Sequence, residues 1–476
     1  MGLSATSSNL IGSAGNIGMY ASGVPFGILI DTKGPRWSVL VGAIALACGY
    51  FPLWSAYNSG PGSMSVGTLC FFSFLTGMGS CSAFSGAIKV SATNWPHHRG
   101  SATAFPLSGF GLSAFAFTLV STFAFPDNTA HYLLMLAIGT FGMVFTGMLF
   151  LQMLPPPSPY QKLSTEEESR PPYLRKNSNQ LQRTTSKHSR HSSKNSIQGE
   201  PVSTDADVDE TSSLMSPTPG DIPDKPADPD HGPHSHKPDI TGWALIKSAS
   251  FWQLFILLGL LCGVGLMTIN NIGNNVKTLW HHFDDSASHD FIQSRQLMHV
   301  SILSLCSFVG RLSSGIGSDI VVKKLHSSRY WSLVASSLIF VLAQIAGLSI
   351  ENPNLLFLLS GLSGLGYGAL FGVFPALVAD AFGAKGLGIN WGAMTMSPVI
   401  SGNIFNTVYG HILDSHSGPV DGHDRLCMDG KSCYSAAYSM TLVISIISVA
   451  WSMYCVWHEA REKRAERKSF TAVHDA

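Results

Sequence analysis

The sequence predicts an all-α membrane protein made of two helix bundles. Hydrophobic residues make up 45% of the 476 residues and charged residues only 12%, whereas soluble domains carry about 25% charged residues. Eleven stretches are apolar enough to cross a bilayer as helices, each of which needs roughly 20 residues. A polar segment separates the first five candidate spans from the last six.

The candidate spans set the expected domain boundaries. The first five cover 8–30, 37–56, 64–89, 101–124 and 131–153, and the other six cover 250–271, 297–319, 329–349, 354–378, 386–412 and 434–457. The first span lacks the basic n-region of a secretory signal and is too long for one. We therefore expect an N-terminal bundle at 1–154, a linker at 155–247, a C-terminal bundle at 248–458 and a tail at 459–476.

The linker has the composition of a disordered segment. It is rich in Ser, Pro, Asp, Lys and His, and it has too few apolar residues to form a core. Three serines follow arginines as in basophilic kinase sites, and "DETSSLM" resembles an acidic dileucine sorting signal, although such short patterns also arise by chance. These residues are Ser178, Ser186 and Ser193, and Glu210, Leu214 and Met215. They predict kinases and a sorting adaptor as partners, and the vacuolar membrane rather than the plasma membrane as the location.

The positive charges of the short loops predict the orientation. Lys and Arg mark the cytosolic side of a membrane protein. They occur in 31–36, 90–100, 320–329 and the tail, and are absent from 57–63, 125–130 and 350–353. The linker and C-terminus are therefore expected in the cytosol and Met1 outside it. Two equal halves would contain twelve helices, so we also expect that a first helix is absent from this chain.

A charged turn lies between the first two candidate spans. It reads "GILIDTKGPR", from Gly27 to Arg36, and "GRLSSGIGSDIVVKK" repeats part of the pattern from Gly310 onward. Two such copies at corresponding places of two halves resemble the signature of the major facilitator superfamily. The resemblance covers all eleven spans and implies two six-helix bundles that move a solute by rocker-switch alternating access.

The resemblance also implies a role for this turn. The Asp31 carboxylate would face the N-terminus of a helix from the other bundle, where the helix dipole favours an anion. The expected conformational latch consists of Gly27, Asp31, Lys33, Gly34, Arg36 and Asp319. The simpler alternative is a charged turn that only fixes the topology.

Arg311 is the single residue that the sequence most specifically predicts to contact a substrate. It lies eight residues before Asp319, which places it about 12 Å inside its helix. "INNIGNN" and the glycine-rich stretch from Gly364 to Gly392 resemble nodulin-like transporters and fungal monocarboxylate-transporter homologues. In related animal transporters and oxalate exchangers an arginine of the eighth helix contacts the substrate carboxylate. The alternative is that Arg311 bonds carbonyls as part of the second signature. The animal pattern, which implies a coupling proton, has an aspartate where this chain has Ser307.

Uncharged polar side chains within the spans are the other substrate-binding candidates. Such groups bond across helices or to a cargo. They are Asn270, Asn271, Asn274, Ser82, Ser85, Tyr367, Asn403 and Asn406. A capped helix end or small-residue packing would explain the asparagines and serines equally well.

The remaining patterns bear on chemistry. Cys427 and Cys433 share a non-cytosolic loop and are candidates for a disulfide, with free thiols as the alternative. We found no pattern for a metal, a cofactor, an enzyme's nucleophile or a nucleic-acid partner. We therefore expect a transporter of a small organic solute, with a carboxylate favoured. A membrane receptor or scaffold that signals through the linker, or an inactive short form, remains the alternative.

Overall fold

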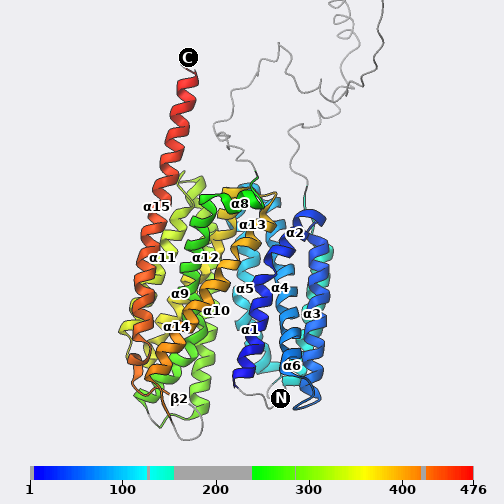
Figure 1. Cartoon of the computed structure of the whole chain (residues 1–476), viewed down its shortest axis with the longest axis vertical. Helices are drawn as coiled ribbons and strands as arrows, with labels where there is room; N and C mark the ends of the chain where they lie inside the picture. Colours follow the sequence, from blue (N-terminus) through cyan, green and yellow to red (C-terminus); the bar gives the residue numbers. More distant parts are fainter. Residues whose placement is uncertain (1–4, 126–128, 155–238, 285, 420–424, 475–476) are drawn as a thin grey trace, which may run out of the picture. The chain divides into compact units, whose positions relative to one another are not determined.

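The computed structural model describes residues 5–125, 129–154, 239–284, 286–419 and 425–474, and it is helical in both halves (Figure 1). The first half consists of α1 (Ala5–Ala21), α2 (Gly23–Lys33), α3 (Pro35–Asn58), α4 (Val66–Asn94), the short 3₁₀ helix η1 (Pro96–His98), α5 (Arg99–Ala124) and α6 (Thr129–Phe150). The second half consists of α8 (Trp243–Lys247), α9 (Ala249–Phe283), α10 (His289–Lys323), α11 (Tyr330–Ser349), η3 (Pro353–Leu356), α12 (Phe357–Phe382), α13 (Leu387–Met394), α14 (Met396–His416), η4 (Gly430–Cys433) and α15 (Ser435–His474).

Local chemistry explains several helix boundaries. The side chains of Ser65 and Ser288 cap α4 and α10 by accepting a bond from the backbone N–H three residues later. Gly34 has φ 93°, which a glycine adopts without strain, and it ends α2 directly before Pro35 begins α3. β1 (Gly418–Pro419) and β2 (Arg425–Leu426) pair antiparallel as a minimal addition to the predicted all-α fold.

Eight helices of the described residues are long and apolar enough to cross a membrane. They are α3, α4, α6, α9, α10, α11, α12 with η3, and α15. The helix α5 and two pairs of consecutive helices run alongside them (Figure 1). The pairs are α1 with α2, and α13 with α14. These helices correspond to the predicted spans 101–124, 8–30 and 386–412, so each of the eleven apolar stretches contains helix.

Two of the predicted spans are broken helices. We predicted single spans at 8–30 and 386–412, but α1 ends at Ala21 before α2, and α13 ends at Met394 before α14. Proline does not break every helix here, since Pro52, Pro106 and Pro375 lie inside continuous helices. Pro25 and Pro398 each remove one backbone hydrogen bond at the two breaks. Each proline lacks the N–H that would bond the carbonyl four residues earlier, and those carbonyls belong to Ala21 and Met394.

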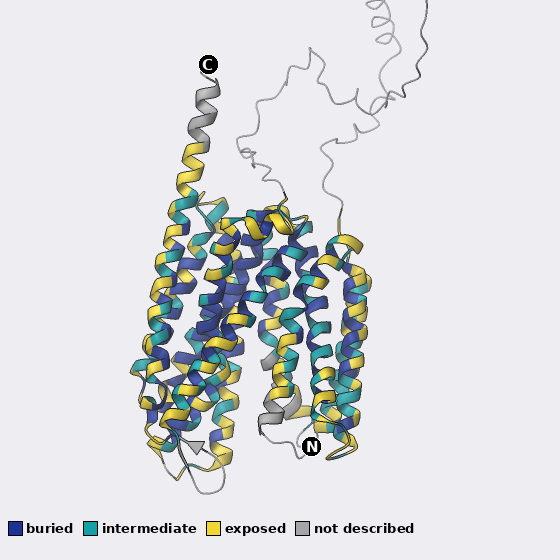
Figure 2. Cartoon of the chain, in the orientation of Figure 1, coloured by how far each residue is buried: buried dark blue, intermediate teal, exposed yellow. Residues whose placement is uncertain are grey.

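The halves pack against each other through α5 with α10 and α2 with α13. Figure 2 shows the most buried residues in the middle of the second half, where 72% of the α12 span is buried, against 6% for α6. We name the ends of this helical unit by their loops. The motif end carries 31–36, 95–99, 324–329 and 383–386, and the disulfide end carries 59–65, 350–356 and 427–434. This division places the sites described next.

Candidate functional site

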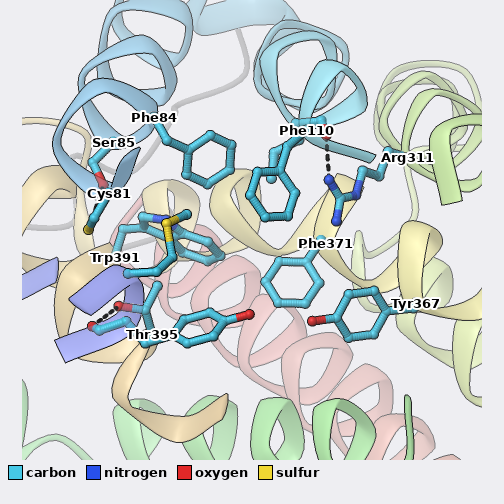
Figure 3. A pocket seen from close by; sticks show the side chains of 12 residues that line it. Cys81, Phe84, Ser85, Phe110, Arg311, Tyr367, Phe371, Trp391 and Thr395 are labelled. Atoms are coloured by element: carbon cyan, nitrogen blue, oxygen red, sulfur yellow. Dashed lines mark hydrogen bonds between the residues drawn. The ribbon is translucent and has the colours of Figure 1, made fainter. Parts of the chain in front are cut away.

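A narrow pocket of about 30 Å³ lies between the two halves (Figure 3). The first half lines it with Met19, Tyr20, Cys81, Phe84, Ser85, Leu107 and Phe110. The second half lines it with Arg311, Tyr367, Phe371, Trp391 and Thr395. Ligand pockets of proteins typically enclose about 300–1,000 Å³, so this pocket must widen before it can hold a small organic molecule.

Arg311 on α10 is the one charged side chain among these twelve described residues, and it is 2% exposed. Its Nη1 donates to the carbonyl of Leu107 on α5 (Figure 3). Its guanidinium carbon lies 5.1 Å from the ring centre of Phe110 and 5.7 Å from that of Phe371. Within the described part of the chain, its Nε has no hydrogen-bond partner. Arg311 thus bonds a carbonyl, as the alternative supposed, and also faces the pocket, as a binding residue would.

Two other predicted residues reach the pocket, and several aromatic ones were missed. Ser85 and Tyr367 line it. The rings of Phe84, Phe110 and Phe371 were not predicted. They come from α4, α5 and α12, so no local pattern in the sequence joins them. The sequence contained one indication that aromatic rings would line the pocket. It was the predicted burial of Arg311, because a buried cation attracts aromatic faces.

The other polar candidates lie outside the pocket. Ser82 bonds Ser38 across α3 and α4, with 2.7 Å between the two Oγ atoms. Asn271 donates to Asn406 at 2.9 Å and so joins α9 to α14. The remaining candidates are also outside it: Asn274 donates to Asn271, Asn403 donates to the carbonyl of Val399, and Asn270 is exposed. Helix-to-helix bonding, rather than pocket lining, describes Ser82, Asn271 and Asn406.

Asp31 joins the two halves at the motif end. Its carboxylate accepts from the backbone N–H groups of Gly388 at 3.2 Å and Ile389 at 2.8 Å, in the first turn of α13. Lys89 of α4 pairs with the same carboxylate at 2.9 Å, and both side chains are under 10% exposed. The Lys89 ammonium also donates to the carbonyls of Ala384 and Lys385 in the second half. Asp31 therefore occupies a positive helix end, as the resemblance implied.

Asp319 makes the reciprocal contact from the second half. It accepts from the backbone N–H groups of Gly100 at 3.0 Å and Ser101 at 2.7 Å, in the first turn of α5. Arg329 pairs with it at 2.8 Å from its own half. Asp380 bonds both Arg329 and Arg99, each at 2.9 Å. Each half thus places one carboxylate on a helix start of the other.

The other expected latch residues contribute unequally. Gly27 packs against the backbone of Gly388, so closely that a Cβ there would meet Ile389. Gly34 shapes the turn, and Arg36 donates to the carbonyl of Leu151 at 2.6 Å within the first half. Lys33 is exposed. Gly27 is therefore part of the contact between halves, whereas Arg36 braces its own half.

Cys427 and Cys433 are joined by a disulfide, with 6.1 Å between their Cα atoms. The loop it closes packs on α9, where His282 Nδ1 lies 2.8 Å from the carbonyl of Met428. Lys431 pairs with Glu351 beside η3 at 2.5 Å, and this hydrogen bond lowers the pKa of the Glu351 carboxyl below its usual value. The disulfide therefore ties this loop across two elements of the second half.

Some predicted residues lie outside the described ranges, namely Ser178, Ser186, Ser193, Glu210, Leu214 and Met215. Within the described residues, no group of three or more His, Cys, Asp or Glu side chains is placed to hold a metal ion.

Comparison with known proteins agrees with the fold and the motif. The "Uncharacterized membrane protein YMR155W" of Saccharomyces cerevisiae is 28% identical, over 95% of this chain and 88% of that protein. A "Probable transporter mch1" of Neurospora crassa is 24% identical, over 93% and 82%. These relatives agree with the fungal group that the sequence resembles.

Solved structures show the same fold. The human organic anion transporter MFSD10 has a TM-score of 0.54 at 14% identity, over 93% of this chain and 83% of that one. The proton:xylose symporter XylE, bound to 6-bromo-6-deoxy-D-glucose, has a TM-score of 0.52 at 13% identity, over 96% and 88%. The sequence profile of the Major Facilitator Superfamily matches residues 1–325. The chain therefore belongs to the Major Facilitator Superfamily, whose members are membrane transporters and not enzymes.

Proposed function

We propose that this protein is a secondary active transporter of a small organic anion, with Arg311 as the anchor of the cargo's carboxylate. One observation carries the proposal: a buried guanidinium faces a pocket between the halves, with its Nε unbonded among the described residues. An arginine fork suits a carboxylate, and a buried cation without a carboxylate partner is costly unless a ligand supplies one.

The motif-end contacts support alternating access. Lys89 shares a half with Asp31, and Arg329 shares a half with Asp319. When the halves separate at this end, both carboxylates lose backbone N–H donors but keep their cations. Opening therefore breaks hydrogen bonds without leaving either carboxylate unpaired, and a hydrogen bond to a charged group contributes about 1.5–3 kcal/mol net. This arrangement suits a contact that forms and breaks in every cycle.

The proposal includes a location and an orientation. The basic short loops favour the cytosol for the motif end, which is the end that these contacts close. The closed motif end then corresponds to a state that faces away from the cytosol. The dileucine-like residues Glu210, Leu214 and Met215 favour the vacuolar membrane. A proton is the proposed coupling ion, and the linker serines are proposed kinase sites.

The test is uptake by vesicles that contain the purified protein, with and without a proton gradient. Radiolabelled acetate, lactate and benzoate are the probes. We expect Arg311→Ala to lower uptake by about 10- to 100-fold, as the loss of a hydrogen bond to a charged group predicts. Arg311→Lys should also lower it, because an ammonium lacks the planar fork.

Arg295→Ala is the matched control. Arg295 lies on the same helix but packs over Trp280 and Phe291 toward the disulfide end. Its loss should leave uptake unchanged. Uptake that survives Arg311→Ala would contradict the proposal, as would the absence of uptake for all three acids.

A further inference from the structure

The charge of the pocket restricts the charge of its ligand. Arg311 is the one ionised side chain among the twelve described lining residues. A cargo with one negative charge would be neutralised there. A second carboxylate would be buried without a cation, which costs several kcal/mol in a medium of low dielectric constant. The pocket therefore favours monoanions over dianions and over neutral solutes.

The surroundings of Arg311 determine how a carboxylate can approach it. Phe110 and Phe371, one from each half, lie over the guanidinium at 5.1 and 5.7 Å. Nη1 already donates to Leu107, whereas Nε has no partner among the described residues. The carboxylate must therefore approach in the plane of the guanidinium, the geometry in which arginine binds carboxylates with two parallel hydrogen bonds.

Six of the twelve lining residues are aromatic: Tyr20, Phe84, Phe110, Tyr367, Phe371 and Trp391. Their rings form tilted pairs, with 5.3 Å between the centres of Phe84 and Phe110 and 4.9 Å between those of Tyr367 and Phe371. Rings that lie this close offer faces and edges to another ring. A flat cargo would therefore gain contacts here that a puckered cargo of the same size would lose.

Trp391 adds a second polar feature to the pocket. It is 2% exposed, and its Nε1–H has no hydrogen-bond partner among the described residues. Phe371 lies between it and Arg311, with 6.3 Å between the two ring centres. A buried indole N–H usually finds a partner. A cargo that reaches from Arg311 past Phe371 could supply the missing acceptor.

We infer that the cargo is a monoanion with a planar, conjugated body and a second hydrogen-bond acceptor. Its carboxylate binds the Arg311 guanidinium, its body lies among the aromatic rings, and its acceptor meets Trp391 Nε1. This inference rests on the proposed transport function and specifies the cargo of the same pocket.

The experiment measures the affinity of the purified full-length protein by titration calorimetry for benzoate, cyclohexanecarboxylate, phthalate and 4-hydroxybenzoate. We expect benzoate to bind about 3- to 10-fold more tightly than cyclohexanecarboxylate, as one or two aromatic contacts predict. Phthalate should bind more weakly than benzoate. 4-Hydroxybenzoate should bind about fivefold more tightly than benzoate, through one additional hydrogen bond.

Trp391→Phe should abolish the preference for 4-hydroxybenzoate, so that the ratio of the two affinities within this variant approaches one. Trp280→Phe is the matched control, because it removes another unpartnered buried indole N–H that lies outside the pocket. Equal affinity for benzoate and cyclohexanecarboxylate would contradict the prediction that the cargo is planar. Tighter binding of phthalate than of benzoate would contradict the prediction that it carries a single negative charge. A preference for 4-hydroxybenzoate that survives in Trp391→Phe would contradict the proposed hydrogen bond between Trp391 Nε1 and the cargo.

Failure of this inference is distinguishable from failure of the transport proposal. Uptake of acetate or lactate that depends on Arg311, without any preference for benzoate, would sustain the transport function and refute the cargo class. If none of the acids binds or is taken up, the transport function fails and the inference fails with it.

Discussion

At the scale of single residues, the motif end depends on charges that are buried but paired within one half. Asp31 and Lys89 both belong to the first half, and each also bonds backbone groups of the second half. An ion pair of this kind contributes little net stability compared with apolar packing, but removal of one partner is costly. The two residues therefore make closure of this end sensitive to a change of a single charge.

We predict that Asp31→Asn opens the motif end. The variant leaves Lys89 buried without its carboxylate and weakens the bonds from the first turn of α13. Breaking a buried pair costs about 3–5 kcal/mol, enough to shift a two-state equilibrium. Spin labels at Lys33 and Lys324, two exposed residues of different halves, should move apart in double electron–electron resonance.

Two further variants test whether the unpaired charge of Lys89 causes the opening. Asp31→Asn combined with Lys89→Met leaves no unpaired buried charge and should recover part of the closed population. Asp284→Asn, which removes an exposed carboxylate outside the motif end, should have no effect. The explanation is wrong if the double variant opens the motif end further than Asp31→Asn alone.

At the scale of elements, the paired breaks in α1–α2 and α13–α14 set the contact between the halves. Gly23 of α2 and Gly392 of α13 pack backbone to backbone, one turn from the pocket residue Thr395. The Thr395 hydroxyl also bonds the carbonyl of Gly392 at 2.8 Å. Absence of a side chain at Gly392 therefore permits the approach of α13 to α2.

We predict that Gly392→Ala destabilises the closed arrangement. The new Cβ would meet the carbonyl oxygen of Gly23 and lie 2.8 Å from the backbone nitrogen of Val24, neither of which can rotate away. Gly410→Ala on α14 is the matched control, because nothing lies within 4 Å of its Cβ. Both changes gain about 1 kcal/mol of helix propensity, so any difference between them reports the contact.

The measurement is the thermal unfolding midpoint of each purified variant. We expect Gly410→Ala to be neutral or slightly stabilising and Gly392→Ala to lower the midpoint. Equal midpoints for the two variants would show that α13 can move away from α2 at no cost.

The apolar stretches of the sequence were sufficient to predict where the helices lie but not where they break. Pro25 and Pro398 each remove the donor for the last residue of the preceding helix. Pro52, Pro106 and Pro375 lie in continuous helices, so a proline alone does not predict a break. The contribution of Arg311 to a pocket followed from its depth in a helix. The rings of Phe84, Phe110 and Phe371 around it did not, because only the packing of three distant helices brings them together.

At the scale of the whole molecule, the two halves carry matched contacts, and the linker joins them in the sequence. The residues of the pocket and of the motif-end contacts described above lie before 155 and after 238, and 155–236 is outside the described ranges. If the protein is a transporter, solute uptake should not depend on this segment. If it is a receptor that signals through its linker, the cellular response should depend on it.

We predict that replacement of 155–236 by a Gly/Ser-rich segment of equal length leaves uptake in vesicles unchanged. A flexible segment of this length spans the connection without imposing a geometry. In cells, the same variant should lose vacuolar sorting. The receptor alternative would be favoured if the native protein shows no uptake of any probe while the replacement alone alters a cellular response.

The short helix α13 has a pharmacological consequence. Its first turn supplies the N–H groups that Asp31 accepts, and Trp391, two residues after Ile389, lines the pocket. Coupling between two sites is reciprocal, so any factor by which closure tightens cargo binding is the factor by which cargo favours closure. If closure tightens cargo binding, an inhibitor that wedges between α2 and α13 at the motif end would weaken cargo binding without entering the pocket, and a high concentration of cargo would weaken the inhibitor in equal measure.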